Sequence, residues 1–361
     1  MSFHLERVGV DGVRNLSAQQ LELNACANIV AGVNGSGKTS LLEALHMLST
    51  GRSFRTASAK PLIAHGADWC LVTGQLRSRS RAMSLGIRRH RNGAADISIN
   101  REKMKSVASL AAALPTVVLE PNSVELVTGA PDGRRRFIDG TMFHVEHDLL
   151  RVWQGYYRVL RQRNSGLRRG ILATDGAWRA ELAEYGCQLS EMRARWVTVL
   201  GGYTRALLQT LSPELADVTV SLRQGWDTTC SLSEALIKSV SSDVKQGFTH
   251  VGPHRGDLRL QVDGRPVSDV FSRGQVKLVV VALKLAQGQV MKEALGSGPV
   301  YLVDDLVSEL DGYHAGHVCE VLAAGGSQIV LTSVDADQAA GLWPSSKMTL
   351  FHVEQGNITA R

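Results

Sequence analysis

The residues with the clearest chemical meaning form one segment near the start of the chain, residues 32–39. Its pattern, G-x-x-x-x-G-K-[ST], is the phosphate-binding loop of NTP-hydrolysing proteins. In such a loop the glycines let backbone N–H groups turn inward around the phosphates. Lys38 would reach the β- and γ-phosphates, and the Thr39 hydroxyl would ligate Mg2+. The sequence therefore predicts a nucleotide site formed by Gly32, Val33, Asn34, Gly35, Ser36, Gly37, Lys38, Thr39 and Ser40.

Two adjacent carboxylates, Asp304 and Asp305, follow an apolar run at 299–303. A buried strand that ends in two carboxylates has the form of a Walker B element. We expect Asp304 to hold Mg2+, and Asp305 to act with Lys38 in catalysis by orienting the attacking water. Asp304 stands 266 residues after Lys38 (304 − 38 = 266), which predicts that an inserted segment separates the two halves of the site.

A third segment, Ser272-Arg273-Gly274-Gln275, directly precedes a strongly apolar helical pattern at 276–286. A hydroxyl, a glycine backbone and the positive end of a helix dipole can bind an anion. The tetrapeptide resembles the S-G-G-Q signature of ABC-type ATPases, and Ser308-Glu309-Leu310-Asp311 resembles the D-loop of that family. In ABC-type proteins two chains pack head to tail, and the signature of one caps the γ-phosphate bound by the other. The resemblance therefore implies that Ser272, Arg273, Gly274, Gln275 and Asp311 contact nucleotide.

The elements that must position these residues follow from apolar periodicity. Residues 28–31 predict a buried strand, and 40–48 predict a helix whose N-terminus faces the phosphates. Alternation predicts strands at 3–10 and 20–23, and several strands within 69–105 with turns at 90–93 and near Asn100. Further strands are expected at 218–222 and at 258–267, the latter around an Asp263-Gly264 turn.

Two heptad patterns occupy the middle of the chain. Apolar residues fall at 145, 149, 152, 156 and 159, and again from Trp178 to Tyr203 in alternating steps of four and three. Thr174 or Asp175 can cap the second helix, after a turn at 164–170. The pattern favours an antiparallel helical hairpin, although an ordinary bundle face is an alternative. We expect an α/β lobe at 1–128 and 248–361, with a RecA-like, mostly parallel sheet and an antiparallel β subdomain, and a helical arm lobe at 129–247.

The net charge of +6 is concentrated in two segments, 77–105 and 131–170. In the first, Arg77, Arg79 and Arg81 alternate along a predicted strand and so share one face. A row of guanidinium groups can follow a nucleic-acid backbone, although an edge strand kept soluble by charge explains the same pattern. The candidate DNA contacts are Arg77, Arg79, Arg81, Arg88, Arg89, Arg134, Arg135 and Arg136.

Other classes of protein are disfavoured by composition. The five cysteines form no C-x-x-C pair, which argues for a reduced, intracellular protein without a zinc site or a disulfide framework. No apolar run is long enough to span a bilayer, and residues 1–30 lack a signal-peptide pattern. His250 and His254 have the spacing of a helical metal pair, but Gly252 and Pro253 between them exclude a regular helix, so we expect no metal there.

Several short segments narrow the resemblance when they are taken together. In chain order they are Arg14-Asn15-Leu16, Gly51-Arg52-Ser53-Phe54-Arg55-Thr56, Arg134-Arg135-Arg136-Phe137-Ile138-Asp139, Val251-Gly252-Pro253-His254-Arg255, Ser272-Arg273-Gly274-Gln275 and Leu302-Val303-Asp304-Asp305-Leu306. In this combination the chain resembles bacterial RecF, a family of recombination mediators whose fold is similar to SMC heads. The resemblance extends from about residue 3 to the C-terminus.

The RecF resemblance implies an ABC-type, SMC-head-like ATPase lobe with Arg14 and Asn15 near the nucleotide. It implies an ATP-dependent homodimer that binds single- and double-stranded DNA at gaps. It further implies that the protein works with RecO and RecR to load RecA, in the cytoplasm and without a membrane partner.

Two positions depart from the general ABC pattern. Asp305 stands where that pattern has a glutamate, and the shorter carboxylate places a water less well, so hydrolysis should be slow. The switch-loop histidine is not evident either, because Val334, or at best a hydroxyl of Thr332 or Ser333, occupies its place. Both departures favour a weak, DNA-stimulated ATPase that acts as a timing switch.

Two alternative functions share the same motifs. The nucleotide-binding subunit of a membrane transporter is disfavoured by Arg273 within the signature and by the two basic segments. An SMC-like structural DNA tether is disfavoured because it requires coiled coils far longer than this hairpin.

Overall fold

The computed structural model describes residues 4–56, 58, 60–78, 82–171 and 173–361, which form two compact units. The first unit comprises Met1–Ser123, Thr210–Ser212 and Lys277–Arg361, and the second comprises Val124–Gln209 and Pro213–Val276. Lys38 and Asp304, the two halves of the predicted nucleotide site, therefore lie in the same unit.

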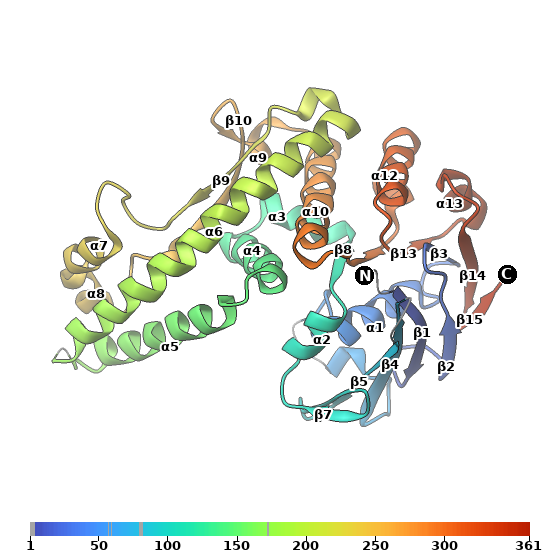
Figure 1. The fold of residues 1–361 in the computed structure, drawn as a ribbon, viewed down its shortest axis with the longest axis horizontal. Coiled ribbons are helices and arrows are strands. Elements are labelled where there is room, and N and C mark those ends of the chain that lie inside the picture. The colour runs from blue at the N-terminus through green and yellow to red at the C-terminus, as the bar shows by residue number, and fades with distance from the viewer. Residues whose placement is uncertain (1–3, 57, 59, 79–81, 172) are drawn as a thin grey trace. The chain divides into compact units, whose positions relative to one another are not determined.

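A six-stranded, mostly parallel sheet forms one layer of the first unit (Figure 1). Its strands, in spatial order, are β15 (Asn357–Ala360), β14 (Met348–Glu354), β3 (Ala27–Ala31), β13 (Ile329–Ser333), β12 (Val300–Val303) and β8 (Thr116–Leu119). Only the β14–β15 pair is antiparallel. Every residue of β3, β12 and β13 is buried, as expected for parallel strands covered on both faces. The predicted sheet is confirmed.

The second sheet of this unit is antiparallel throughout. Its strands, in spatial order, are β2 (Gln19–Glu22), β1 (His4–Asp11), β4 (Trp69–Arg77), β5 (Ala82–His90), β6 (Ala95–Ile99) and β7 (Glu102–Met104). Alternate residues of β4 are buried from Cys70 onward, so one face of the sheet meets the core. The predicted turn near Asn100 is a two-residue connection in which Asn100 and Arg101 both have positive φ, the geometry favoured in hairpins.

Helix α1 (Lys38–Thr50) packs against both sheets of the first unit, touching β4 and β5 of the antiparallel sheet and β8, β12 and β13 of the other. Because it is covered on several sides, most of its residues are buried, including Leu41, Leu42 and Leu45. The helix ends at Gly51, whose φ of 71° is the left-handed conformation common at helix ends. The core of the first unit therefore holds the helix that begins at the phosphate loop.

The remaining helices of the first unit are short. They are α2 (Ala108–Ala113), α11 (Leu306–Glu309), α12 (Gly312–Ala324) and α13 (Ala336–Leu342), with 3-10 turns at Lys60–Leu62 and Pro121–Val124. The long helix α10 (Arg273–Leu295) begins in the second unit and belongs to the first from Lys277 onward.

The second unit is mainly helical. Its helices are α3 (Glu125–Thr128), α4 (Pro131–Val145), α5 (Leu149–Arg168), α6 (Asp175–Leu211), α7 (Leu232–Lys238), α8 (Val240–Gln246) and α9 (Val267–Val270), and α6 belongs to this unit as far as Gln209. Its strands are β9 (Thr219–Arg223), β10 (Asp257–Val262) and β11 (Arg265–Pro266), and it has 3-10 turns at Pro213–Leu215 and Pro253–Arg255. Residues 248–276, which we expected in the ATPase lobe, belong to this unit, where β10 pairs with β9.

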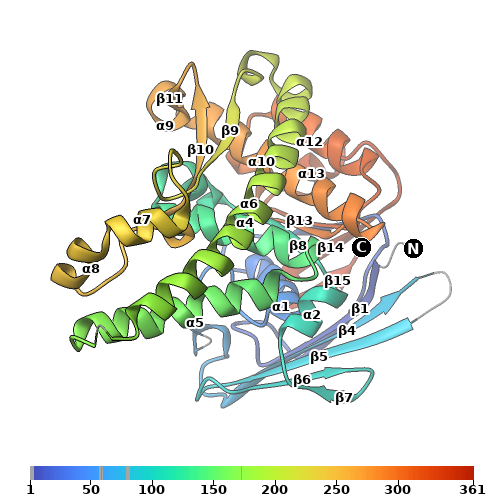
Figure 2. The same ribbon diagram turned by 60° about the vertical axis from the view of Figure 1, so that its left-hand side comes forward.

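Helices α5 and α6 lie side by side and antiparallel, as Figures 1 and 2 both show. A Cβ at Gly155 would lie 2.7 Å from the ring of Tyr185, and one at Gly166 would collide with the ring of Trp178. Both positions therefore need glycine so that aromatic rings of α6 can pack onto the backbone of α5. The predicted helical hairpin is confirmed.

The start of the hairpin differs from the prediction. Val145 is the last residue of α4, and α5 begins only at Leu149. Glu146 has an extended backbone, and its Oε1 accepts hydrogen bonds from Arg195 Nη2 and Trp196 Nε1, each at 2.9 Å. The helix is therefore interrupted between α4 and α5 at Glu146, and the apolar spacing alone does not indicate this interruption.

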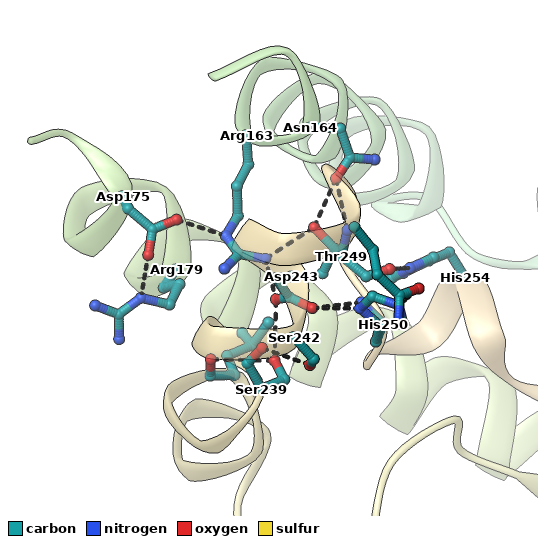
Figure 3. Close-up of polar contacts among 12 residues, drawn as sticks. Arg163, Asn164, Asp175, Arg179, Ser239, Ser242, Asp243, Thr249, His250 and His254 are labelled. Carbon is teal, nitrogen blue, oxygen red and sulfur yellow. Dashed lines mark hydrogen bonds and ion pairs between the residues drawn. The ribbon is translucent and has the colours of Figure 1, made fainter. Parts of the chain in front are cut away.

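A buried polar network joins the hairpin to α8 (Figure 3). Arg163 of α5 is fully buried, and it pairs with Asp175 at 2.8 Å and with Asp243 at 2.7 Å. Asp175 also accepts from Arg179 at 2.7 Å, so its carboxylate binds two arginines at the start of α6. Burying a charge is costly unless it is paired, and here the carboxylates of Asp175 and Asp243 pair with the buried guanidinium of Arg163.

His250 and His254 serve this network and its neighbours. His250 Nδ1 lies 2.7 Å from Asp243 Oδ1 (Figure 3). His254 Nε2 donates to the Thr249 carbonyl at 3.0 Å, which leaves Nδ1 to accept from the Tyr156 hydroxyl at 2.6 Å. Burial lowers the pKa of His254 to about 4, in keeping with this neutral arrangement. Within the described ranges, no group of three His, Cys, Asp or Glu side chains is arranged to hold a metal.

Candidate nucleotide-binding site

The phosphate loop connects β3 to α1 and depends on glycine at several positions. Gly35 and Gly37 have φ of 81° and 124°, values that favour glycine. A Cβ at Gly32 would collide with the carbonyl oxygen of Val353 in β14. The Gly356 N–H donates to the Ser36 carbonyl at 2.8 Å, so the β14–β15 hairpin braces the loop from the side.

Lys38 is the first residue of α1 and is almost fully buried. Its Nζ donates to the carbonyl oxygens of Gly32 at 2.6 Å and Val33 at 3.0 Å. Burial lowers the pKa of Lys38, and the nearby Asp305 and Asp304 oppose this shift. The ammonium group is thus held against the loop by the loop's own backbone.

Thr39 and Asp304 meet although they are 265 positions apart. The Thr39 Oγ1 lies 3.1 Å from both carboxylate oxygens of Asp304. This pairing arises because β12, which ends just before Asp304, belongs to the sheet against which α1 packs. A hydroxyl and a carboxylate are oxygen ligands of the kind that Mg2+ prefers, so the two residues fit the predicted metal role.

Thr332, at the end of β13, completes the surroundings of Asp304. Its Oγ1 donates to Asp304 Oδ1 at 2.7 Å and accepts from the Asp305 N–H at 3.0 Å. Burial raises the pKa of Asp304, and the hydrogen bonds from Thr332 and Thr39 oppose that rise. Of the three residues considered for the switch position, Thr332 is therefore the one that contacts the carboxylate.

The other two candidates for the switch position point elsewhere. Ser333 Oγ accepts from the Asp335 N–H at 3.2 Å, and Val334 is an exposed side chain. The sequence could not choose among them, because β13 is buried along its whole length and shows no alternation that marks one face.

Asp305 adopts an uncommon backbone conformation. Its φ of 52° and ψ of 44° lie in the left-handed region, which costs a non-glycine residue roughly 1 kcal/mol or more. Its Oδ1 is buried and has no hydrogen-bond partner among the described residues. A carboxylate oxygen without a protein partner can accept a hydrogen bond from water, as the predicted catalytic role requires.

Asn15 supports the phosphate loop directly. Its Nδ2 donates to the Gly35 carbonyl at 3.1 Å, and its Oδ1 accepts from Ser40 Oγ at 2.8 Å. Arg14 instead forms a two-point ion pair with Glu43 of α1, with Nε 2.6 Å from Oε2 and Nη2 2.7 Å from Oε1. Thus Asn15 touches the loop, whereas the guanidinium of Arg14 is engaged with α1.

Sequence reasoning missed Glu43, Ser53 and Arg55 at this site. Glu43 is fully buried and also accepts a hydrogen bond from Ser53 Oγ. Ser53 Oγ in turn accepts from the Arg55 N–H at 2.9 Å. Burial raises the pKa of Asp304, and the charge of Arg55 is one of the influences that oppose this rise. Glu43 is the one carboxylate among mostly apolar residues of this helix, and that position was the sequence signal for a buried, paired charge.

The signature residues lie at the start of α10, in the second unit. The Ser272 N–H donates to Gln275 Oε1 at 3.0 Å, and the Gln275 N–H donates to Ser272 Oγ at 3.4 Å, a reciprocal cap. Ser272, Arg273 and Gly274 are exposed. In the first unit, exposed Asp311 caps α12 by accepting from the N–H groups of Tyr313 and His314, each at 3.1 Å.

The predicted DNA contacts on the antiparallel sheet differ in exposure. Arg77 is exposed and pairs with Glu6 at 2.8 Å. Exposed Arg88 stacks on Trp69, with its guanidinium carbon 4.8 Å from the ring centroid, while partly buried Arg89 donates to the Gly93 carbonyl at 3.4 Å. Arg79 and Arg81 lie outside the described residues.

The three arginines of α4 also differ. Arg134 is largely buried and binds both carboxylate oxygens of Asp257, at 2.8 and 3.1 Å. Arg135 donates to the Gly256 carbonyl at 2.8 Å. Arg136 is 73% exposed and pairs with Asp132 at 3.2 Å. Of the three, only Arg136 presents its guanidinium mainly to solvent.

None of the described helices combines the length and apolar character that crossing a membrane would require.

Comparison with known proteins covers nearly the whole chain. The family model of the RecF/RecN/SMC N-terminal domain matches residues 4–359. The DNA replication and repair protein RecF of Pseudomonas fluorescens strain Pf-5 is 41% identical over 98% of this chain and 98% of its own length. The protein of the same name from Marinomonas sp. strain MWYL1 is 40% identical over 98% of this chain and 97% of its own length.

Solved structures agree with this likeness. The recombination mediator protein RecF-ATP of the RecFOR pathway matches with a TM-score of 0.87 and 26% identity, over 100% of this chain and 98% of that one. An Smc head bound to the C-terminal winged-helix domain of ScpA has a TM-score of 0.57 at 13% identity, over 99% and 97% of the two chains, and supports the fold alone. The SMC-head-like fold expected from the sequence is confirmed, and the chain belongs to the RecF family.

Proposed function

We propose that this chain binds ATP with Mg2+ and serves DNA replication and repair as an ATP-dependent, slowly hydrolysing switch on DNA. The observation that carries the proposal is the meeting of Thr39 with Asp304 beside the phosphate loop. Family membership and the likeness to the RecF-ATP structure support the same conclusion.

The residues of the loop fit a nucleotide. Gly35 and Gly37 give the loop its positive φ angles, and the buried Ser36 Oγ has no partner among the described residues. A free hydroxyl donor in such a loop suits a group that brings many acceptor oxygens. Lys38 would bind the β- and γ-phosphates, while Thr39 and Asp304 would hold Mg2+. When bound, the metal neutralises charge that develops on the phosphate oxygens.

Asp305 sets the rate in this proposal. Its unpartnered Oδ1 would accept a hydrogen bond from the attacking water, and its fixed left-handed backbone limits where that water can sit. Because the side chain is one methylene shorter than glutamate, the water is held less well and hydrolysis is slow. Slow hydrolysis suits a timer for release from DNA.

The signature residues would complete the site of a second copy in an ATP-induced, head-to-tail homodimer. Support comes from the exposure of Ser272, Arg273 and Gly274 at the N-terminus of a long helix, an arrangement that favours an anion. Gln275 and the α12 cap Asp311 would line the same interface. ATP then links the two copies, and its hydrolysis separates them.

Sedimentation velocity with and without ATP tests this arrangement. Lys38→Ala should abolish ATP binding and leave a monomer, because the phosphates lose their cation. Ser272→Ala should bind ATP in the monomer but dimerise at least about tenfold more weakly, since the capping hydroxyl is contributed in trans. Normal ATP-dependent dimerisation by Ser272→Ala would rule out capping by a partner chain.

We further propose that the dimer binds single- and double-stranded DNA at gaps and, with RecO and RecR, helps to load RecA. Exposed Arg77, Arg88 and Arg136 supply positive charge for the phosphate backbone. A solved relative is described as a recombination mediator of the RecFOR pathway. ATP should raise the affinity for a gapped duplex without any membrane component, and unchanged affinity would favour the transporter alternative.

A further inference from the structure

Lys277 lies on α10 four positions after Arg273 of the signature (277 − 273 = 4), and it bonds to the turn that follows the two catalytic-site carboxylates. Its Nζ is 2.8 Å from Glu309 Oε2 and 3.1 Å from the Glu309 carbonyl oxygen. The two side chains are 32% and 27% exposed, so the pair is partly shielded from solvent. Both residues belong to the first unit.

The turn that Lys277 holds is the single-turn helix α11, which begins directly after Asp305 and ends at Glu309. It is internally hydrogen-bonded, with Ser308 N–H donating to the Asp305 carbonyl and Leu310 N–H to the Leu306 carbonyl, each at 3.1 Å. A short helix leaves its last carbonyls unsatisfied, and a lysine at that end both donates a hydrogen bond and favours the dipole. Lys277 therefore fixes the far end of the turn that Asp305 starts.

Helix α10 can transmit a displacement at Lys277. It is one continuous helix from Arg273 to Leu295, and beyond Lys277 it is anchored by buried Val279, Val280 and Leu283. Close-packed interiors move as bodies rather than deform continuously. A shift of α11 is thus passed by the ion pair to the same helix that carries Arg273, Gly274 and Gln275.

We propose that Lys277 and Glu309 are a positioning pair that couples the geometry of Asp305 to the presentation of the signature. The inference rests on the proposed ATP-dependent function. Among the described residues, the polar interactions of Lys277 are with Glu309 and not with the phosphate loop. The pair acts through α11 on one side and through α10 on the other, so that ATP bound by the phosphate loop beside Asp304 and Asp305 aligns the signature for a partner copy.

The test uses the full chain with three substitutions. Lys277→Met keeps the stem and removes the charge, and Lys277→Arg keeps a cation that can donate to Glu309. Lys292→Met is the matched control, because Lys292 stands on the same helix and its Nζ donates to the Gly325 carbonyl at the end of α12, 2.7 Å away. The measurements are binding of a fluorescent ATP analogue, ATP-dependent sedimentation, and kcat and KM for ATP.

Lys277→Met should bind the analogue within about twofold of the parent, but its kcat and its ATP-dependent dimerisation should each fall about tenfold with KM nearly unchanged. Lys277→Arg should recover most of both losses, and Lys292→Met should match the parent. If Lys277→Met had the kcat and the dimerisation of the parent, the proposed coupling would be wrong, whereas the proposed function would stand. The same conclusion would follow if Lys277→Met lost ATP binding to the same extent as activity. A parent protein that binds no ATP would overturn both this inference and the proposed function.

Discussion

At the scale of single residues, the acid chemistry of Asp304 depends on two hydroxyl groups. Burial raises the pKa of this carboxyl, whereas the hydrogen bonds from Thr332 and Thr39 stabilise its charged form. The balance matters because only an ionised carboxylate can ligate Mg2+. In the proposed site, Thr332 would thus support Mg2+ binding without serving as a ligand itself.

Thr332→Val should move the acid limb of the ATPase pH profile upward. The substitution removes a hydrogen bond to a charged group, worth about 1.5–3 kcal/mol, so the pKa of Asp304 should rise by roughly one unit or more. Activity would then fall at a higher pH as the solution is acidified, because protonation releases the metal. Steady-state hydrolysis measured across the pH range, with saturating gapped DNA, checks this outcome.

Ser333→Ala is the control for that experiment. Its hydroxyl is equally buried, but it accepts from the Asp335 N–H and does not touch Asp304. Its acid limb should coincide with that of the parent. Equal displacement of both profiles would show that the effect arises from general damage to β13.

The sequence could assign residues to the proposed phosphate site because their spacing reflects local chemistry. Lys38 and Thr39 belong to a loop whose backbone shape is encoded within eight residues, and Asp304 ends a strand that reads as buried. The partner of Glu43 could not be predicted, since a lone carboxylate in an apolar helix does not indicate that Arg14, 29 positions away, will pair with it. The same limit left Thr332 undecided against Ser333.

At the scale of elements, the second unit uses arginine as an internal connector. Arg163 bridges α5, α6 and α8, and Arg193 of α6 binds Asp139 of α4 at 2.8 Å. Arg134 joins α4 to β10 in the same way. Part of the positive charge counted in the 131–170 segment is therefore matched by buried or partly buried aspartates. The heptads predicted the helices, but exposure cannot be read from residue type.

Arg163→Met should lower the free energy of unfolding by about 3–5 kcal/mol, because it removes the buried cation that pairs with both Asp175 and Asp243. Chemical denaturation followed by far-ultraviolet circular dichroism measures the change. Arg158→Met on the same helix is the control. Its pairing with Glu181 spans 4.0 Å between half-exposed side chains and should contribute less than about 1 kcal/mol. Similar losses for the two variants would contradict the role of the network.

At the scale of the whole molecule, net charge and its distribution govern the expected response to salt. A protein that neutralises several phosphates releases condensed counterions, so the affinity for DNA falls steeply as salt rises. The relevant charges are those left in solvent, such as Arg88 and Arg136, rather than the total of +6.

Arg136→Ala should weaken binding to a gapped duplex and lower the slope of log affinity against log salt by about one. Fluorescence anisotropy with ATP at several potassium chloride concentrations provides both values. Arg195→Ala removes a similarly exposed arginine outside the two basic segments and should leave the slope unchanged. An affinity independent of salt would exclude the phosphate-backbone contacts altogether.

The overall architecture was predictable to the level of its layers. Each layer has a local sequence pattern that indicates its structure. Continuous apolar runs indicate the buried strands β3, β12 and β13, alternation indicates β4, and heptad spacing indicates α5 and α6. Helix α4 was missed because three consecutive arginines interrupt its apolar pattern and its ion-pair partners are distant in sequence. Arg134 pairs with Asp257 of β10, and Asp139 pairs with Arg193 of α6. Residues 248–276 lie in the second unit, where β10 pairs with β9. No local sequence pattern indicates this pairing, so these residues were expected in the other lobe.

The place of β3 in its sheet has a consequence for how the protein is made. This strand carries the phosphate loop and is synthesised early, yet both of its neighbours, β13 and β14, are synthesised late. The Ile358 N–H even bonds to Gln19 Oε1 across 339 positions. A nascent chain on the ribosome therefore cannot complete the surroundings of its phosphate loop until β14 has emerged, so incomplete chains from interrupted translation would lack the proposed nucleotide site.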